Sequence, residues 1–358
     1  MDEYSVRGQL PEKKEMISLN VAGGKKHRGF AMFLICCGLL LAAFAVSTLW
    51  AKNGGEGFFG NGGGILDGET DTTAQNNRIP NEPETSDPTS QSPPHPPLPS
   101  GATPIVSMDL AYLDRGKNYI YNETVYTPDV EGLLNREVLV VDSSKSPKVL
   151  ILHTHTSEGY LAPDAEYIEG SLGDSTYTRD SSNSVVAVGE VLARVLNEKG
   201  ITAIHCTVMH DDPTVKGAYD RAKETIQYYL SIYPDIQYVI DLHRDAVLSA
   251  DGEYVRTTAL SNGESVAQVM AVVGTDGNGT DCAHWEDNLA LALQLRNLLN
   301  ANGASVCRPV SLKNASYNQE LATRSLLLEI GTGANSIEEA KRSAELVGEA
   351  LAVLLQER

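Results

Sequence analysis

The sequence has little basic charge. Its 358 residues include 28 Lys and Arg against 47 Asp and Glu, a formal net charge of −19. Because binding to phosphate groups needs a basic face, this balance argues against a nucleic-acid partner. Charged residues make up only 21% of the chain and apolar residues 42%, so the chain can bury at least one sizeable core.

Cysteine is also scarce, and none of the five cysteines forms a CxxC pair. The sequence therefore indicates neither a disulfide framework, nor a thiolate metal site, nor a dithiol redox centre. We predict that Cys206, Cys282 and Cys307 are core residues. A GxSxG motif is absent and Cys206 falls in a predicted strand, so nucleophilic catalysis by Ser or Cys is not expected.

One long apolar run stands near the N-terminus. Residues 29–51 contain no charged side chain, and a run of this length can cross a bilayer as one helix. Lys25, Lys26 and Arg28 precede it, so the positive-inside rule keeps residues 1–28 in the cytoplasm and places the rest outside. A cleaved signal peptide is the alternative, but its apolar region is usually shorter. We predict an uncleaved single-pass anchor in the cell membrane.

The segment after the anchor has the composition of a linker. Residues 52–104 are rich first in Gly and then in Asn, Thr, Ser and Pro, which leaves too little apolar surface for folding. We predict a disordered linker here, followed by one extracytoplasmic domain over 105–358. Such a linker would let the domain reach a polymeric target away from the bilayer, although a stalk with no other role fits the composition equally well.

The outer part of the chain has the pattern of an α/β domain. After a strand and helix layer that begins near residue 105, short β-rich apolar runs alternate with helical patterns. This alternation is typical of a single domain with a mostly parallel twisted sheet flanked by helices. The strands are expected at 149–153, 201–207, 238–242, 266–273, 304–310 and 325–330. The helices are expected at 183–199, 214–232, 285–300 and 336–355.

Ionisable side chains collect at the carboxyl ends of these strands, where active groups of such sheets lie. The first strand runs into HTHTSEGY, in which His155 and Glu158 form an HxxE spacing that can direct an imidazole and a carboxylate at one cation. The third strand, in YVIDLHRDA, delivers His243 to the same edge. These three residues are the predicted ligands of one Zn²⁺ with an open position for water.

The last strand, in SLLLEIGTGANS, ends on a carboxylate. Glu329 follows three leucines, where a carboxylate is costly unless it is paired or functional. We predict that it is the general base that takes a proton from the metal-activated water and gives it to the leaving amine. Pairing of Glu329 with Arg324 or Arg244 is the alternative.

Several nearby residues have more than one possible role. His153 lies two residues before His155 and either supports a ligand or is itself a ligand in place of His155. Asp241 or Asp245 can accept the free N–H of a ligating histidine and so set its tautomer. His205 is expected in a strand, and His210 and His284 are expected in exposed loops.

Arg244 and Arg308 are candidates for contact with the substrate. We predict Arg244 as a catalytic group that polarises the scissile carbonyl and Arg308 as a substrate-binding residue that holds a carboxylate. Surface salt bridges are the alternative for each.

Four segments, in order and behind one N-terminal anchor, resemble a known family. They are HTHTSEGY, TRDSSNSVVAVGEVLARVLNEKG, YVIDLHRDA and SYNQELATRSLLLEIGTGANSIEEAKRSAELVGEAL. Over residues 147–354 the chain resembles the stage II sporulation protein P family, which looks like a branch of the zinc N-acetylmuramoyl-L-alanine amidases of bacterial cell walls.

The resemblance implies a zinc amidase/carboxypeptidase-like fold and a peptidoglycan hydrolase that cuts stem peptides from glycan strands, with endopeptidase activity on the cross-links. It also implies a role in septal wall thinning and engulfment during endospore formation, beside stage II sporulation proteins D and M. Carried over by position, the zinc ligands fall on His155 and His243 and the catalytic glutamate on Glu329.

The second ligand is where this sequence departs from the wider amidase class. In that class a ligating Glu opens the first helix, but Ser-Ser-Asn occupies 181–183 here. The HxxE spacing assigns the ligand to Glu158, with Asn183 as the alternative.

Two other functions compete with the amidase. One is a non-catalytic peptidoglycan-binding scaffold of the same fold. The other is a zinc carboxypeptidase, which needs an arginine that grips a free carboxylate. Arg244, Arg308 and Arg324 cannot be told apart for this purpose from the sequence.

Overall fold

The computed structural model describes residues 98–111 and 119–356. The predicted cytoplasmic segment 1–28, the anchor 29–51 and most of the linker 52–104 lie outside these residues. Within the described ranges no helix has both the length and the apolar character needed to cross a bilayer.

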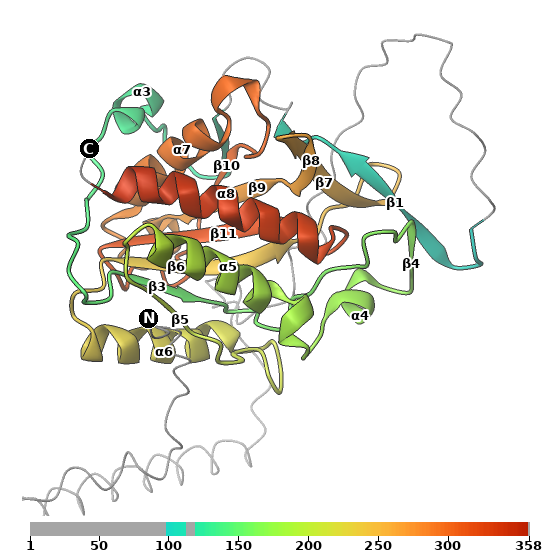
Figure 1. Cartoon of the computed structure of the whole chain (residues 1–358), viewed down its shortest axis with the longest axis horizontal. Coiled ribbons are helices and arrows are strands. Elements are labelled where there is room, and N and C mark those ends of the chain that lie inside the picture. The colour runs from blue at the N-terminus through green and yellow to red at the C-terminus, as the bar shows by residue number, and fades with distance from the viewer. Residues whose placement is uncertain (1–97, 112–118, 357–358) are drawn as a thin grey trace, which may run out of the picture. The chain divides into compact units, whose positions relative to one another are not determined.

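A large sheet forms the centre of the domain (Figure 1). Its strands, in spatial order, are β2 (Ile120–Asn122), β10 (Val310–Lys313), β9 (Val269–Gly274), β11 (Arg324–Thr332), β6 (Tyr238–Asp245), β3 (Val149–Leu152) and β5 (Ala203–His205). Neighbouring strands are parallel except for β9 and β11. The prediction of an α/β domain with a mostly parallel sheet is confirmed, with one antiparallel pair at its middle.

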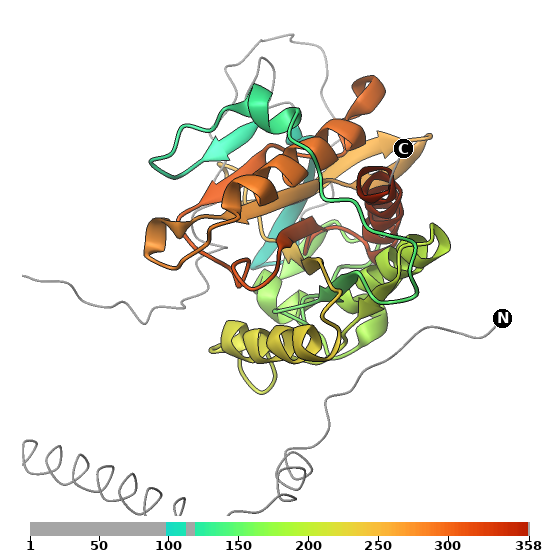
Figure 2. The same cartoon turned by 90° about the vertical axis from the view of Figure 1, so that its left-hand side faces the viewer.

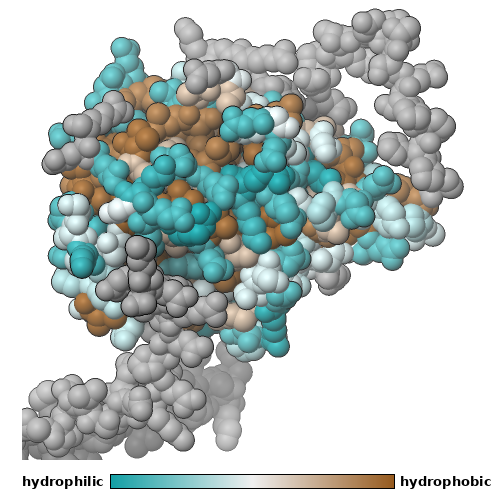
Figure 3. Space-filling view, viewed as in Figure 1, coloured by the Kyte–Doolittle hydropathy of each residue, from teal (hydrophilic) through white to brown (hydrophobic). Residues whose placement is uncertain are grey.

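Helices cover both faces of this sheet (Figures 1 and 2). One face is covered by α5 (Val185–Glu198), α7 (Trp285–Leu299) and α8 (Ile337–Leu355), and the other by α6 (Ala218–Ile232). All four helices were predicted. The solvent side of α5 and α8 is largely hydrophilic (Figure 3), which leaves their apolar faces for the core. At the start of α8, Ser336 and Glu339 form a capping box.

Alternation along the central strands decides which side chains face α6. The side chains of β6 and β11 that join the core under α5, α7 and α8 are Tyr238, Ile240, Leu242, Leu326, Leu328 and Ile330. Because successive side chains of a strand point to opposite faces, Asp241, His243 and Glu329 point to the α6 side.

These two strands run further than predicted. β6 continues to Asp245 and β11 to Thr332, because each pairs with the other along this stretch. His243 therefore lies within a strand and not in the loop after it, whereas Asp241 and Glu329 lie inside the strands as predicted.

A smaller sheet stands beside the large one. Its order is β4 (Tyr167–Glu169), β1 (Ala102–Met108), β7 (Tyr254–Ser261) and β8 (Glu264–Ala267). β1 begins inside the predicted linker. The β7–β8 hairpin was not predicted, although Asn262 and Gly263, at φ 53° and 82°, form its two-residue turn. Asn-Gly is the preferred sequence for such a turn and was a usable signal.

The predicted strand at 266–273 is two strands in two sheets. Gln268, between β8 and β9, is fully buried. Its side-chain amide donates to Asp109 Oδ1 (2.7 Å) and to the Ser305 carbonyl (2.6 Å). These bonds hold the chain where it passes from the small sheet to the large one.

The predicted strand at 304–310 is wrong except for its last residue. β10 begins at Val310, and Cys307 forms an isolated bridge to Val269. The Asn300 side chain donates to the Cys307 carbonyl and accepts from the Cys307 N–H, both at 2.7 Å. The asparagine thus occupies backbone groups that a strand would use for its ladder.

Candidate metal centre and active site

Two segments bring three potential metal ligands together. β3 ends at Leu152, and the turn after it carries His155 and Glu158, while β6 carries His243. One ligand atom from each lies within 4.8 Å of the others, and across the described residues this is the one such group of His, Cys, Asp or Glu. The structure therefore assembles the trio that the sequence predicted.

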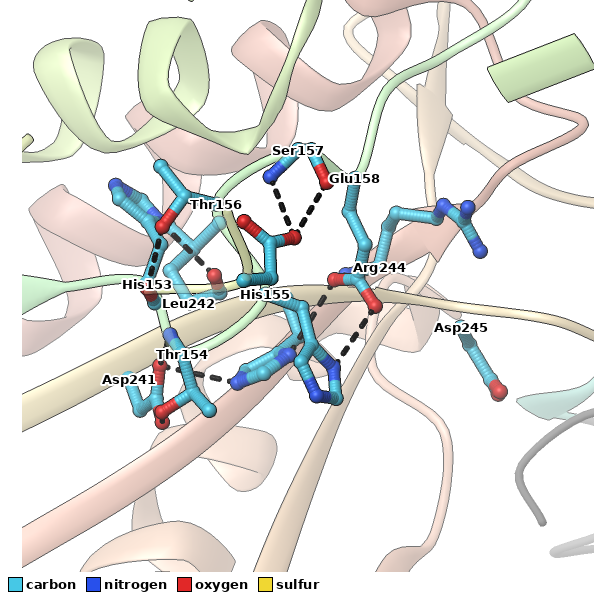
Figure 4. Close-up of polar contacts among 12 residues, drawn as sticks. His153, Thr154, His155, Thr156, Ser157, Glu158, Asp241, Leu242, Arg244 and Asp245 are labelled. Atoms are coloured by element: carbon cyan, nitrogen blue, oxygen red, sulfur yellow. Dashed lines mark hydrogen bonds and ion pairs between the residues drawn. The ribbon is translucent and has the colours of Figure 1, made fainter. Parts of the chain in front are cut away.

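Glu158 contacts both imidazoles, and Figure 4 shows its carboxylate directed at His155. Its Oε1 is 3.3 Å from His155 Nδ1, and its Oε2 is 3.3 Å from His243 Nδ1. Glu158 and His243 are buried, whereas 21% of the His155 side chain is exposed. Two imidazole nitrogens and a carboxylate oxygen are a donor set that suits Zn²⁺, and the exposed side of His155 leaves a direction of approach for a further ligand.

The charges of this cluster favour a cation. Burial opposes ionisation of Glu158, but the neighbouring His243 and His155 hold the pKa of its carboxyl well below its usual value. Burial likewise opposes protonation of His243, but Asp241 and Glu158 raise the pKa of its imidazole well above the usual value. A metal ion bound here would replace the proton on His243, so binding releases protons.

Asp241 lies against the candidate ligand His243. Its Oδ1 lies 3.0 Å from His243 Nε2. The same carboxylate accepts hydrogen bonds from the Thr154 N–H (2.8 Å) and hydroxyl (2.6 Å). Of the two aspartates considered from the sequence, the structure places Asp241 against the imidazole, while Asp245 contacts Arg308. A carboxylate at this position is suited to orienting the histidine.

Glu329 stands beside the cluster. In the parallel pair β6–β11 it lies directly opposite His243. The residue is partly exposed, but its Oε2 is buried and has no hydrogen-bond partner among the described residues. Burial and then Asp245 raise the pKa of its carboxyl to about 8. A buried oxygen without a partner, next to a candidate metal ligand, is suited to exchanging a proton with a water there.

Arg244 does not face the cluster with its head group. Its backbone N–H donates to Glu158 Oε2 at 3.1 Å. Its guanidinium donates to the Gly159 carbonyl (3.3 Å) and to Thr176 Oγ1 (3.0 Å) and points away from His155 (Figure 4). This geometry does not support the predicted role in polarising a carbonyl; it makes Arg244 a residue that positions Glu158.

The other two arginines have carboxylate partners. Arg308 Nη2 is 2.7 Å from Asp245 Oδ2, and both side chains are buried. Arg324 Nη2 is 3.3 Å from Asp287 Oδ2. The alternative in which Glu329 pairs with Arg324 or Arg244 does not occur. Substrate binding by Arg308 stays a prediction.

Comparison with known proteins assigns the chain to a family. The model of the family "Stage II sporulation protein P (SpoIIP)" matches residues 69–352, most of the chain. This protein belongs to the stage II sporulation protein P family. Stage II sporulation protein P of Bacillus subtilis (strain 168) is 32% identical over 207 residues, which make up 55% of this chain and 48% of that protein. The match thus spans about half the length of this curated relative.

Solved structures of amidases show a weaker likeness. The apo N-acetylmuramyl-L-alanine amidase Ami1 of Mycobacterium abscessus is 13% identical, with 59% of this chain and 100% of that chain covered and a TM-score of 0.35. N-acetylmuramoyl-L-alanine amidase AmiC2 of Nostoc punctiforme is 17% identical, with 60% and 100% covered and a TM-score of 0.34. These TM-scores are too low to establish a shared fold.

In this member of the stage II sporulation protein P family, His153 does not join the potential ligands. Its Nδ1 is 2.9 Å from the Leu242 carbonyl, and its Nε2 is 2.9 Å from His205 Nε2. Burial lowers the pKa of His153 to about 4, so the ring is neutral. The expectation that His153 and His155 share one side fails because the strand ends at Leu152 and a turn follows.

Asn183, the alternative second ligand, has a different role. The side-chain amide of Asn183 donates to the Tyr160 carbonyl at 2.9 Å. The backbone carbonyl of Asn183 accepts a hydrogen bond from the Tyr160 N–H at 3.2 Å. It thus holds the segment that leads away from Glu158. Glu158 takes the position beside both histidines.

The predicted burial or location of the three cysteines and of His205, His210 and His284 is confirmed with one exception. Burial was correctly predicted for Cys206, Cys282 and Cys307. His205 ends strand β5 and His284 is exposed, as expected. His210 is buried, because its Nδ1 lies 2.7 Å from the His153 carbonyl and its Nε2 lies 2.9 Å from Thr225 Oγ1.

Sequence reasoning missed two tyrosines at the cluster. The Tyr219 ring packs edge-on against His155, with centroids 5.7 Å apart, and the Tyr317 ring lies 6.0 Å from Tyr219. Tyr317 and Asn318 both have positive φ, 52° and 58°, and the Asn318 amide donates to the Tyr219 carbonyl at 2.9 Å. Tyr219 is in the first turn of α6 and Tyr317 in a loop, so no periodic pattern pointed to either.

Proposed function

We propose that this protein is a zinc-dependent peptidoglycan hydrolase that cleaves the amide bond between N-acetylmuramic acid and the stem peptide. The observation that carries the proposal is the cluster of His155, Glu158 and His243 with Glu329 on the adjacent strand. Membership of the stage II sporulation protein P family supports the same reading.

The chemistry follows from the positions of these groups. Zn²⁺ held by His155, Glu158 and His243 would supply Lewis acidity for the amide carbonyl and would lower the pKa of a water. Glu329 accepts a proton from the attacking water and delivers it to the leaving amine nitrogen. Asp241 keeps the His243 imidazole oriented throughout. No side chain forms a covalent bond to the substrate in this scheme.

The cellular setting is part of the proposal. The apolar run at 29–51 would anchor the protein in the cell membrane with its domain outside, where the wall polymer lies. The linker at 52–104 would give the domain reach into the wall. From the family resemblance we add endopeptidase activity on cross-links, septal wall thinning and engulfment during endospore formation, and the partners stage II sporulation proteins D and M.

A peptidoglycan-binding scaffold without turnover is the competing function. The presence of all three potential ligands, of the supporting Asp241 and of an unpaired Glu329 oxygen favours the enzyme. A scaffold has no need of a costly buried carboxylate oxygen without a partner.

Muropeptide analysis tests the proposal. Purified sacculi are incubated with the full chain, with a chelator, and with the chelator followed by added zinc. We expect free stem peptides that disappear with the chelator and return with zinc, together with cleaved cross-links if the endopeptidase is also present. Glu329→Gln should bind zinc and release nothing. A wild-type chain that sediments with sacculi but releases nothing, even when a glycan-cleaving transglycosylase is added, supports the scaffold.

A further inference from the structure

A cavity of about 230 Å³ opens beside the cluster, and Glu158 and Arg244 both line it. The rest of its lining comes from α4 (Leu172–Thr176) with the residues next to it, from the chain that follows β6, and from β7. The largest apolar and aromatic side chains of its wall are Leu172, Tyr177, Val247, Leu248 and Tyr254. We call this space the Arg244 cavity. Its walls combine apolar and aromatic side chains with polar groups, and the Arg244 guanidinium is its cationic group.

The charge of Arg244 has no carboxylate partner within the part of the chain that the structure describes. The residue is 5% exposed, and its guanidinium bonds to two neutral acceptors, the Gly159 carbonyl and Thr176 Oγ1. Its Nη1 makes no hydrogen bond to any described residue, and its head group lies over the Tyr177 ring, 5.2 Å from the centroid. A buried cation is costly unless an anion compensates it.

Glu158 does not compensate the charge of Arg244. It contacts Arg244 through the backbone N–H, at 3.1 Å, and not through the guanidinium. Its two oxygens face His155 and His243, so a metal ion held at the cluster would take up its charge. An anion that compensates Arg244 must therefore come from outside the described residues, through the cavity.

The other candidate arginines are already compensated. Arg308 is paired with Asp245 at 2.7 Å and Arg324 with Asp287 at 3.3 Å. Among the three arginines that could grip a substrate carboxylate, Arg244 is the one whose charge is left for a ligand.

We propose that the Arg244 cavity binds a carboxylate on the peptide side of the substrate, within the first two amino-acid residues after the scissile amide at the metal cluster. The inference rests on the proposed function for the identity of the substrate. The cavity is smaller than the roughly 300–1,000 Å³ of pockets that hold drug-sized ligands, so it suits one amino-acid residue and not a sugar pair. The ligand is therefore an acidic residue, or a terminal one, with a short aliphatic body against the apolar walls.

A matched pair of product dipeptides tests the site without relying on turnover. The probes are L-alanyl-D-glutamine, which has one carboxylate on its second residue, and its carboxamide. Calorimetry on the zinc-loaded full chain gives the Kd of each. We expect the carboxylate form to bind about tenfold or more tightly, the usual worth of a charge-assisted hydrogen bond. Equal Kd values, or no binding of either probe, overturn the inference.

Variants assign the effect to the cavity. Arg244→Gln should bind both dipeptides equally weakly, and Arg244→Lys should keep part of the preference because it keeps the charge. Arg324→Gln is the matched control, because Arg324 is paired with Asp287, and it should keep the full preference for the carboxylate dipeptide. Arg244→Gln also removes hydrogen bonds that hold the fold, so Ala246→Leu serves as a second variant. The leucine narrows the cavity from its wall and should weaken binding of the carboxylate dipeptide, while the zinc content stays unchanged. Retained preference in Arg244→Gln overturns the proposal.

Hydrolysis of the matching N-acetylmuramoyl dipeptides, measured in parallel, separates this inference from the proposed function. Release at equal kcat/KM from the two substrates overturns the carboxylate site and leaves the hydrolase standing. A clear difference in Kd without any hydrolysis supports the carboxylate site and overturns the hydrolase.

Discussion

Glu329 lies directly opposite His243 on the neighbouring parallel strand. Adjacent strands are about 4.8 Å apart, so the sheet ladder itself sets the separation between the proposed base and a proposed metal ligand. Both residues point to the α6 side of the sheet, and the strands that carry them pair along most of their length. The pair therefore stands on rigid elements and not on loops, as catalytic geometry requires.

Replacing Glu329 should change how stability depends on pH in the metal-free protein. The pKa of Glu329 is raised from 4.5 to about 8, so the folded state binds this proton more tightly than the unfolded state. Its contribution to stability is therefore lost as pH rises from about 4.5 to about 8. Relative to the wild type, Glu329→Gln should gain roughly 2–4 kcal/mol of unfolding free energy over this range.

Urea unfolding in the presence of a chelator, at pH 5 and at pH 8.5, measures this difference. Glu264→Gln, at an exposed position of β8, is the control and should track the wild type. If the difference in unfolding free energy between Glu329→Gln and the wild type stays constant with pH, Glu329 is not protonated in the folded protein.

Removing a histidine of the cluster should remove zinc. His155→Ala deletes one of three donors and should weaken zinc binding by at least about 100-fold, more than the loss of a supporting residue costs. His284→Ala, which removes an exposed histidine beside Asp287, should leave binding unchanged. Competition titration against a chromophoric chelator gives both affinities. Equal zinc affinity in the two variants would refute the proposed ligand set.

Asp241→Asn should lower zinc affinity about 10- to 100-fold. The carboxylate 3.0 Å from His243 Nε2 is lost, so the imidazole becomes less basic and less firmly oriented. Thr154 still anchors the side chain through its hydroxyl, which limits structural damage. The same titration measures the effect, with exposed Asp251→Asn as the control. An unchanged affinity would mean that Asp241 serves only the fold.

Gly189→Ala should destabilise the protein, although alanine usually stabilises a helix. A Cβ at this position of α5 would lie 2.7 Å from ring atoms of His153 and His205. The normal gain of about 1 kcal/mol is then outweighed by a packing strain of about 1–3 kcal/mol. Urea unfolding measures the sign of the change in unfolding free energy. In a His205→Ala background the penalty should shrink, and a net gain in stability in the wild-type background would refute the close approach.

Some of the fold could be predicted because its signals are local. The apolar periods of α5, α6, α7 and α8 located these helices, and the short apolar runs located β3, β6 and β11. Other elements depend on distant contacts. The split of 266–273 between two sheets depends on Gln268 bonding to Asp109 and Ser305, and the loss of the strand at 304–310 depends on Asn300. No pattern within those segments reports such partners.

The sequence by itself determined the chemistry of the cluster, because the HxxE spacing of His155 and Glu158 and the placement of His243 after an apolar run are local features. Only the tertiary structure decided what surrounds it. It turned His153 away, placed Tyr219 against His155, and left Arg244, of the three candidate arginines, without a carboxylate partner among the described residues. Whether a charge is compensated depends on residues far apart in the chain, as in the pair of Arg308 and Asp245. The spacing of two residues along the sequence does not tell how far apart their side chains lie in the folded protein.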